Sequence, residues 1–233
     1  MRRYQAMFAG VGMGNMTQNL CALSWVLGFN SAMDTLVSQA VGGNNYELCG
    51  VYLNRGRFLM TLMFIPITIV LMNSERILVA AYQDPEVAKF AQLYVITNLP
   101  GIYLIGLSDC QRRFLNNFGK NNISFYAGFS AMVLHSFWSY IFVIKLDLEI
   151  IGTGLANVTT QITIFMMLYW FTKREDQIQE AVFMPDKRVL SKQGTWDYVK
   201  LGVPGVVQTC LDWWVWELMI LICGFFPEET KVQ

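Results

Sequence analysis

Two carboxylates interrupt an otherwise uncharged, apolar stretch near the end of the chain. Asp212 and Glu217 lie in the segment 210–217 (CLDWWVWE). A carboxylate at the middle of a bilayer raises the insertion free energy by on the order of 3 kcal/mol, so such residues are commonly functional. Burial beside tryptophans favours the neutral acid. A group of this kind can bind a proton on one side of a membrane and release it on the other. We therefore expect Asp212 and Glu217 to be ion-coupling groups; the alternative is that one of them forms a structural ion pair or extends to a membrane interface.

A substrate cavity is the expected setting for this pair. On an α-helix the two carboxylates are about 140° apart and flank a broad face. We expect Trp213 and Trp214 to line the cavity, together with Asn19 and Asn30 of the first hydrophobic stretch. That stretch carries many polar groups, and one face of it should therefore line a bundle interior or an aqueous cavity.

A second set of residues is expected to have structural or gating roles, with substrate contact as the alternative for Asp34. Asp34 and Gln39 lie toward the end of the first hydrophobic stretch, and Arg113 is the expected ionic partner of Asp34. Pro204 lies near the start of the last stretch. The single histidine, His135, is interpreted as a hydrogen-bonded packing residue, with a proton relay as the alternative.

Other kinds of chemistry lack support in the sequence. There is no G-x-S-x-G elbow, no H-E-x-x-H motif and no P-loop, so we expect no enzyme. The five cysteines are far apart and form no C-x-x-C pair, which leaves no basis for a metal site or a redox dithiol. The net charge is zero, which gives no electrostatic case for nucleic acid as a partner. We expect no cofactor other than the coupling ion.

The elements that must position these residues are membrane helices. Hydrophobic residues make up 54% of the chain, charged residues 15%, and the mean hydropathy is +0.37. Since about 20 apolar residues cross a bilayer as a helix, the sequence predicts an all-α polytopic bundle with about six transmembrane helices, embedded in a lipid bilayer. The predicted spans are 15–40, 58–73, 90–108, 121–144, 150–172 and 201–226.

The loop charges predict the orientation of the bundle. The first, third and fifth loops have a positive balance and the second and fourth a negative one, so the positive loops are expected on the cytoplasmic side. This alternation leaves Arg2 and Arg3 outside, and an additional helix ahead of Met1 would remove the conflict. The charged segment 173–200 is interpreted as a cytoplasmic linker and as the domain boundary.

Four motifs together resemble the eukaryotic multidrug and toxic compound extrusion (MATE) transporters. Segment 31–42 (SAMDTLVSQAVG) is similar to their A-L-D-T-L-x-x-Q-A-x-G signature, 112–115 (RRFL) to R-[RK]-[FY]-L, and 151–157 (IGTGLAN) to G-x-G-A-A-x-A-x. Segments 198–204 (YVKLGVP) and 210–217 resemble F-x-K-L-A-x-P followed by C-L-E-W-W-x-x-E. Asp212 stands where the family has glutamate. This difference puts in question the pH range over which the carboxyl group binds a proton and how far the side chain reaches into the cavity.

The resemblance implies a twelve-helix antiporter of two lobes, of which this chain carries helices two to seven. Residues 1–172 would form an incomplete N-terminal lobe and 201–233 the first helix of the C-terminal lobe. Such a protein exports amphipathic or cationic organic compounds in exchange for protons or sodium, at a plasma membrane or a vacuolar-type membrane. The chain is expected to need the missing helices. A receptor or sensor without transport and an inactive truncated fragment are the alternatives.

Overall fold

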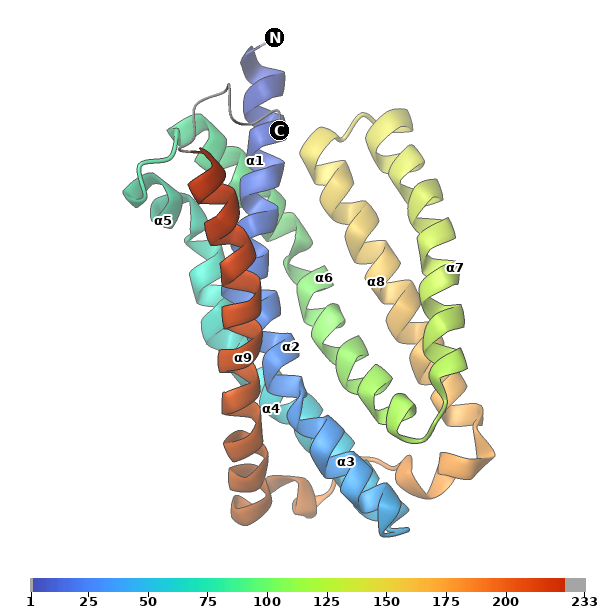
Figure 1. Ribbon diagram of the computed structural model, residues 1–233. Helices are drawn as coiled ribbons and strands as arrows, with labels where there is room; N and C mark the ends of the chain where they lie inside the picture. The colour runs from blue at the N-terminus through green and yellow to red at the C-terminus, as the bar shows by residue number, and fades with distance from the viewer. Residues whose placement is uncertain (1, 225–233) are drawn as a thin grey trace.

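The computed structural model describes the backbone of residues 2–224, and their side chains except at positions 2, 177, 217, 218 and 220–224. Every regular element in this range is helical (Figure 1). The α-helices are α1 (Arg2–Gln18), α2 (Ser24–Asn30), α3 (Ala32–Gly42), α4 (Tyr46–Met72), α5 (Ser74–Ala80), α6 (Pro85–Asn117), α7 (Asn121–Ser139), α8 (Glu149–Arg174) and α9 (Lys192–Gly224). The described residues also contain two π-helical turns, η1 (Asn19–Leu23) and η2 (Tyr140–Lys145), and two 3-10 turns, η3 (Asp176–Ala181) and η4 (Lys187–Leu190). The predicted all-α fold is confirmed.

The first predicted span, 15–40, was too short. The elements α1, η1, α2 and α3 follow one another as a single rod of 40 residues, Arg3–Gly42, which is long and apolar enough to cross a membrane. Its early turns contain Gly10, Gly12 and Gly14. Gly10 and Gly14 allow close packing on α6, since a Cβ at Gly10 would lie 2.5 Å from Phe90 Cβ.

The second and third spans were also predicted too short, at the end where arginines occur. Helix α4 begins at Tyr46, where the Asn45 side chain accepts a hydrogen bond from Leu48 N at 3.0 Å, and it runs through Arg55 and Arg57. Helix α6 begins after the capping residue Asp84 and continues to Asn117. Both extensions carry charges that hydropathy assigns to loops, but Arg55, Arg57 and Arg113 find hydrogen-bond partners within the bundle.

The fourth and fifth spans agree closely with prediction, because charged residues coincide with the helix ends. Asn121–Lys145 and Glu149–Arg174 are both long and apolar enough to span a membrane. The sixth predicted span, 201–226, lies in α9 up to Gly224, and its last two residues lie outside the described range. Helix α9 begins at Lys192, so the last nine residues of the predicted linker 173–200 are helical.

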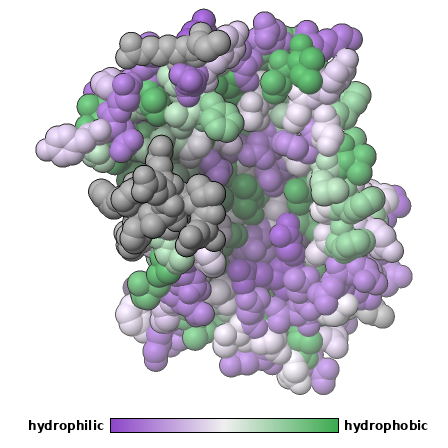
Figure 2. All heavy atoms as spheres, turned by 45° about the horizontal axis from the view of Figure 1, so that its top comes forward, coloured by the Kyte–Doolittle hydropathy of each residue, from purple (hydrophilic) through white to green (hydrophobic). Residues whose placement is uncertain are grey.

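The described helices include five that could cross a membrane by length and composition. Large hydrophobic side chains are correspondingly exposed, and Figure 2 shows hydrophobic residues among hydrophilic ones on the visible face. On α7, for example, Phe125 is 65% and Met132 64% exposed. Apolar surface on this scale is unusual for a soluble monomer and is expected of helices that face lipid or further helices.

The loops group by predicted charge sign at the two ends of the bundle. In Figure 1 the α3–α4, α6–α7 and α8–α9 connections lie at the lower end, and the α4–α6 and α7–α8 connections at the upper end. Ion pairs join the lower connections to one another: Lys120 to Glu175 at 2.8 Å, and Arg188 to Glu47 at 2.7 Å. At the other end Arg3 pairs with Glu149 at 3.3 Å. We call the lower end the linker end.

Candidate functional site

The first helical rod is broken at Ser31, between α2 and α3. Ser31 N donates to Gly28 O at 3.2 Å, three residues back, and Ser31 Oγ donates to the same oxygen at 2.6 Å. In a continuous α-helix Ser31 N would instead bond to Leu27 O, four residues back. The break therefore leaves the Leu27 carbonyl without its helical donor, and a buried carbonyl needs another partner.

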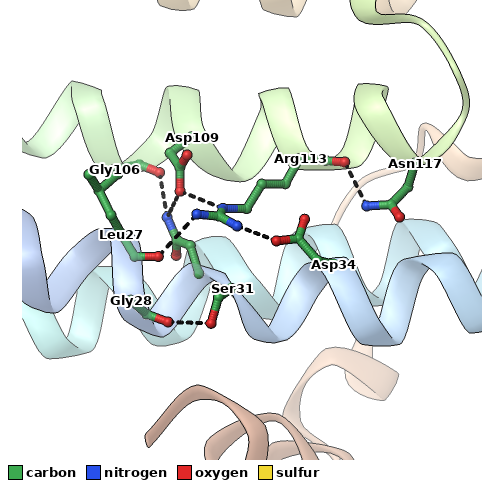
Figure 3. Close-up of polar contacts among 9 residues, drawn as sticks. Leu27, Gly28, Ser31, Asp34, Gly106, Asp109, Arg113 and Asn117 are labelled. Atoms are coloured by element: carbon green, nitrogen blue, oxygen red, sulfur yellow. Dashed lines mark hydrogen bonds and ion pairs between the residues drawn. The ribbon is translucent and has the colours of Figure 1, made fainter. Parts of the chain in front are cut away.

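Arg113 of α6 supplies that partner and two ionic contacts as well (Figure 3). Its Nη2 donates to Leu27 O at 3.2 Å, its Nε to Asp109 Oδ2 at 2.9 Å, and its Nη1 to Asp34 Oδ2. The ion pair between Arg113 and Asp34 that the sequence suggested is thus present. Because the planar guanidinium presents five donors in a fixed fork, one side chain can hold both helices at the break.

Asn30 belongs to the same network and not to a cavity wall. The sequence placed Asn30 at a substrate cavity, but its side chain is fully buried. Its Nδ2 donates to Gly106 O and to Asp109 Oδ2, both at 3.1 Å. Asp109 therefore accepts from Asn30 of α2 and from Arg113 of α6, which makes it the centre of the network. We call Asn30, Asp34, Asp109 and Arg113 the break network.

The other polar residues predicted in this rod lie outside the break network. Asn19 is half-buried and opens the π-helical turn η1, an irregularity that often occurs at functional sites. Gln39 is exposed on α3 near the linker end. Next to η1, the buried Gln18 accepts a hydrogen bond from Asn98 of α6 at 2.7 Å. The structure therefore brings Asp34 and Arg113 together but leaves Asn19 and Gln39 apart from them.

Helix α9 packs directly on the break. A Cβ at Gly205 would contact Ser31 Oγ and would lie 2.5 Å from Gly28 O. Cys210 Sγ lies 3.5 Å from Ser24 Oγ one turn earlier on α2. The buried face of α9 is formed by residues at a spacing of four: Tyr198, Gly202, Val206 and Cys210. Pro204 lies off this face and is exposed.

The predicted ion-coupling residues lie beyond this contact on α9. Asp212 is two residues after the buried Cys210, about 200° around the helix, so it is exposed and not enclosed by neighbouring tryptophans in this chain. Trp213 is half-buried and Trp214 is 41% exposed. Asp212 has no ionic partner within 4 Å among the described side chains. The side chain of Glu217 lies outside the described residues.

Several polar residues that sequence reasoning missed lie between α4 and its neighbours. Arg55 is buried and donates to Val189 O at 3.0 Å and to Arg188 O at 2.6 Å, which fastens the linker to α4. Arg57 donates to Gln111 of α6, and Gln111 Nε2 donates to Thr172 Oγ1 of α8 at 2.6 Å. The sequence signal was the pair of arginines at the edge of an apolar run, which hydropathy assigns to a loop.

His135 has an ordinary packing environment. His135 Nδ1 lies 2.8 Å from Thr160 Oγ1 of α8, and Nε2 lies 3.3 Å from Ser139 Oγ. This is the hydrogen-bonded packing role that the sequence favoured. Among the side chains that the structure describes, no cluster of three or more His, Cys, Asp or Glu residues has the geometry to hold a metal ion.

Both the sequence and the fold of this chain are similar to those of known proteins. Multidrug and toxin extrusion protein 1 of Danio rerio is 30% identical over 220 residues, covering 94% of this chain and 37% of the relative. Protein DETOXIFICATION 16 of Arabidopsis thaliana is 30% identical over 227 residues, covering 92% of this chain and 44% of the relative. The crystal structure of the eukaryotic MATE transporter AtDTX14 superposes with a TM-score of 0.86 at 21% identity, covering 94% of this chain and 48% of that one.

The chain thus spans less than half the length of these three proteins. The fold extends over nearly all of the chain, including α9. The MatE family model matches residues 5–141, which are more than half of the sequence. As its motifs predicted, the chain belongs to the MatE family.

Proposed function

We propose that this chain is part of a secondary active antiporter that exports amphipathic or cationic organic compounds in exchange for protons. The observation that carries the proposal is the position of Asp212 in a MatE family chain. Asp212 lies on an apolar helix, is exposed, and has no ionic partner within 4 Å among the described side chains. A carboxyl group that must bind and release a proton needs access and must not be held by a permanent cation.

The proposed cycle alternates protonation with substrate binding. Protonation of Asp212 or Glu217 removes a negative charge that would otherwise attract a cationic substrate, so proton and substrate compete for one site. Trp213 and Trp214 present aromatic faces that suit an organic cation. Because the chain spans less than half of its relatives' length, this activity is assigned to the longer assembly that contains these helices.

The break network has a positioning role in this proposal. Transporters of this kind alternate by rocking one helical group against another. Helix α9 contacts the first rod at Ser31, where Arg113 holds the broken helix to α6. We assign Asp34, Arg113, Gln39 and Pro204 to the control of that movement. Export at a plasma membrane or at a vacuolar-type membrane fits the proposal equally.

The test uses proteoliposomes that contain the full-length protein carrying these helices. Efflux of a fluorescent organic cation is driven first by a pH gradient and then by a sodium gradient, which separates the two coupling ions. The double variant Asp212→Asn with Glu217→Gln should abolish pH-driven efflux, whereas Asp176→Asn, an exposed acid in the linker, should leave it unchanged.

The outcomes separate the competing functions. Undiminished efflux from the double variant would overturn the coupling assignment. Saturable binding of the cation with no gradient-driven flux in the wild-type protein would instead indicate a receptor or sensor. Flux from the longer protein but none from the present chain alone would identify the present chain as an inactive fragment.

A further inference from the structure

A cavity of about 900 Å³ opens at the linker end of the bundle, away from the residues proposed for transport. Its walls come from α4, α6, α8 and the linker. Neither Asp34, Arg113 nor Asp212 lines it. The cavity has a cationic part and an apolar part. Arg57, Lys173 and Lys187 form the cationic part, and Phe58, Leu107 and Met184 form the apolar part.

Arg57 is the least exposed of these three cations, and no carboxylate among the described side chains lies within 4 Å of its guanidinium nitrogens. Its Nη2 donates to Gln111 Oε1, and its Nη1 lies 3.5 Å from Asn54 Oδ1, so both acceptors are neutral. Its Nε is buried and has no acceptor among the described atoms. A guanidinium stays protonated in proteins, and a largely buried charge without a counter-charge is unfavourable. An anion in the cavity would supply that counter-charge.

The two lysines extend the cationic surface outward along α8 and the linker. Lys173 Nζ lies 4.8 Å from the centre of the Tyr169 ring, and neither Lys173 nor Lys187 forms an ion pair with a described side chain. The acidic residue among the described lining is Asp186. Its carboxylate is already occupied by Arg188, which donates from Nε at 2.6 Å and from the backbone N at 2.9 Å. The cavity therefore has a net positive charge.

Hydroxyl donors and apolar side chains complete the lining. Thr61 Oγ1 and Tyr103 OH lie 3.0 Å apart on facing helices and both line the cavity. Phe58 is 41% exposed and Met184 85% exposed, which provides apolar contact area at the mouth. A small inorganic anion would use only the cationic part. A ligand with an anionic head and hydrocarbon chains would use both parts.

We propose that this cavity binds the phosphate of an anionic phospholipid headgroup, with Arg57, Lys173 and Lys187 as its cationic contacts. The loop charges place this end of the bundle on the cytoplasmic side, where anionic lipids attract basic pockets between helices. Arginine binds phosphate oxygens through parallel N–H donors, and lysine contributes a point charge. Free phosphate shares the headgroup chemistry, so the experiment must distinguish the two sources.

The test is native mass spectrometry of the purified full-length protein that carries these helices, released from detergent micelles. The micelles contain equal amounts of phosphatidylglycerol and phosphatidylcholine. The protein should retain phosphatidylglycerol in preference to phosphatidylcholine. Arg57→Gln should lower the retained phosphatidylglycerol by about tenfold, the effect of one lost charge-assisted contact. The double variant Lys173→Gln with Lys187→Gln should also lower the amount of retained phosphatidylglycerol. Because both lysines are exposed, this variant keeps the test valid if Arg57→Gln does not fold.

The matched control is Arg112→Gln. Arg112 is exposed on α6 at the same end of the bundle and does not line the cavity. This variant should retain phosphatidylglycerol like the wild type. An equal loss in Arg112→Gln would overturn the proposal, because attraction to the general surface charge would then suffice. No preference between the two lipids in the wild type would overturn it as well.

A second measurement addresses free phosphate. Inorganic phosphate is added at millimolar concentration to the same protein in neutral detergent, and the midpoint of thermal unfolding is recorded. Phosphatidylglycerol should raise the midpoint at a far lower concentration than phosphate does. If phosphate alone raised the midpoint fully, through Arg57, and phosphatidylglycerol did not, the lipid assignment would be wrong.

Discussion

Arg113 on α6 donates from Nη2 to the main-chain oxygen of Leu27 at 3.2 Å, and this oxygen is the carbonyl that the break at Ser31 leaves without a helical donor. The same guanidinium contacts Asp109 and Asp34. One side chain therefore satisfies a backbone acceptor and two carboxylates from two different helices. The geometry of the broken rod depends on α6 through this residue.

Replacement of Arg113 by glutamine should destabilise the fold. Asp109, with a side chain only 12% exposed, would lose its cation, and Leu27 O would lose its donor. Asp34 is half exposed, so solvent screening reduces the contribution of its ion pair with Arg113 to the free energy of unfolding. We expect Arg113→Gln to lower the free energy of unfolding by about 2 kcal/mol, measured by denaturation in mixed micelles with circular dichroism.

The control for that variant is the neighbouring Arg112→Gln, which removes the same charge from an exposed position. It should change the free energy of unfolding by less than about 0.5 kcal/mol. Asp109→Asn should destabilise more than Asp34→Asn, in the order of their burial. Equal losses in Arg112→Gln and Arg113→Gln would show that the break network contributes nothing specific.

The contact between α9 and the break should be sensitive to a single methyl group. A Cβ at Gly205 would contact Ser31 Oγ and would lie 2.5 Å from Gly28 O. Because one of these neighbours is backbone, Gly205→Ala must separate the helices, and we expect a loss of about 1–3 kcal/mol. Gly128→Ala on α7 faces open space. It should be neutral or stabilising by about 0.5–1 kcal/mol, so an equal loss in both variants would contradict the packing argument.

The helix ends could be predicted where charge and membrane boundary coincide. Lys145, Glu149 and Lys173 lie at the ends of their helices, so the fourth and fifth spans were right to within a few residues. The rule that charged residues mark the helix ends fails for α4, because its arginines lie inside the bundle. Arg55 is held by the carbonyl oxygen of Val189, more than 130 residues away. A hydropathy window contains no information about such a partner.

The candidate site could be predicted only in part, because residue type does not specify every contact that a side chain or backbone group makes. Asp34 and Arg113 carry opposite charges at the same end of two predicted helices, and their pairing followed from that placement. The break at Ser31 depends on which backbone acceptor its N–H uses, and residue type does not specify this. The role of Asp109 depends on the break, so it was missed. Asn30 was assigned to a cavity because polarity alone does not tell which face of a helix is buried.

The Asp186 carboxyl provides a pH-dependent contact within the linker. Hydrogen bonds from Arg188 lower the pKa of Asp186 below its ordinary value of 3.8. A lowered pKa means that the contact is complete above the ordinary value and is lost as the pH falls through the lowered one. We expect a carbon-13 titration of labelled aspartates, with Asp186→Asn for assignment, to place Asp186 below 3.8.

Arg188→Gln should raise the pKa of Asp186 toward the ordinary value, because it removes the side-chain donor. Lys187→Gln removes the same charge one residue earlier but no hydrogen bond to Asp186. It should leave the lowered pKa nearly unchanged. A similar rise in both variants would mean that general charge, and not the specific contact, lowers the pKa.

Arg55 holds the linker by its backbone, and its loss should expose the linker to protease. The carbonyl oxygens of Arg188 and Val189 both accept from the Arg55 guanidinium, so trypsin can cleave after Arg188 only when that segment opens locally. Arg55→Gln should raise the rate of this cleavage by about tenfold, corresponding to one or two lost hydrogen bonds to a charged group, as followed by mass spectrometry of the fragments.

Glu47→Gln removes only the exposed ion pair to Arg188, with side chains 61% and 52% exposed. Since such pairs contribute little, its cleavage rate should stay within about twofold of wild type. Equal acceleration in both variants would assign the attachment of the linker to surface charge instead of to Arg55.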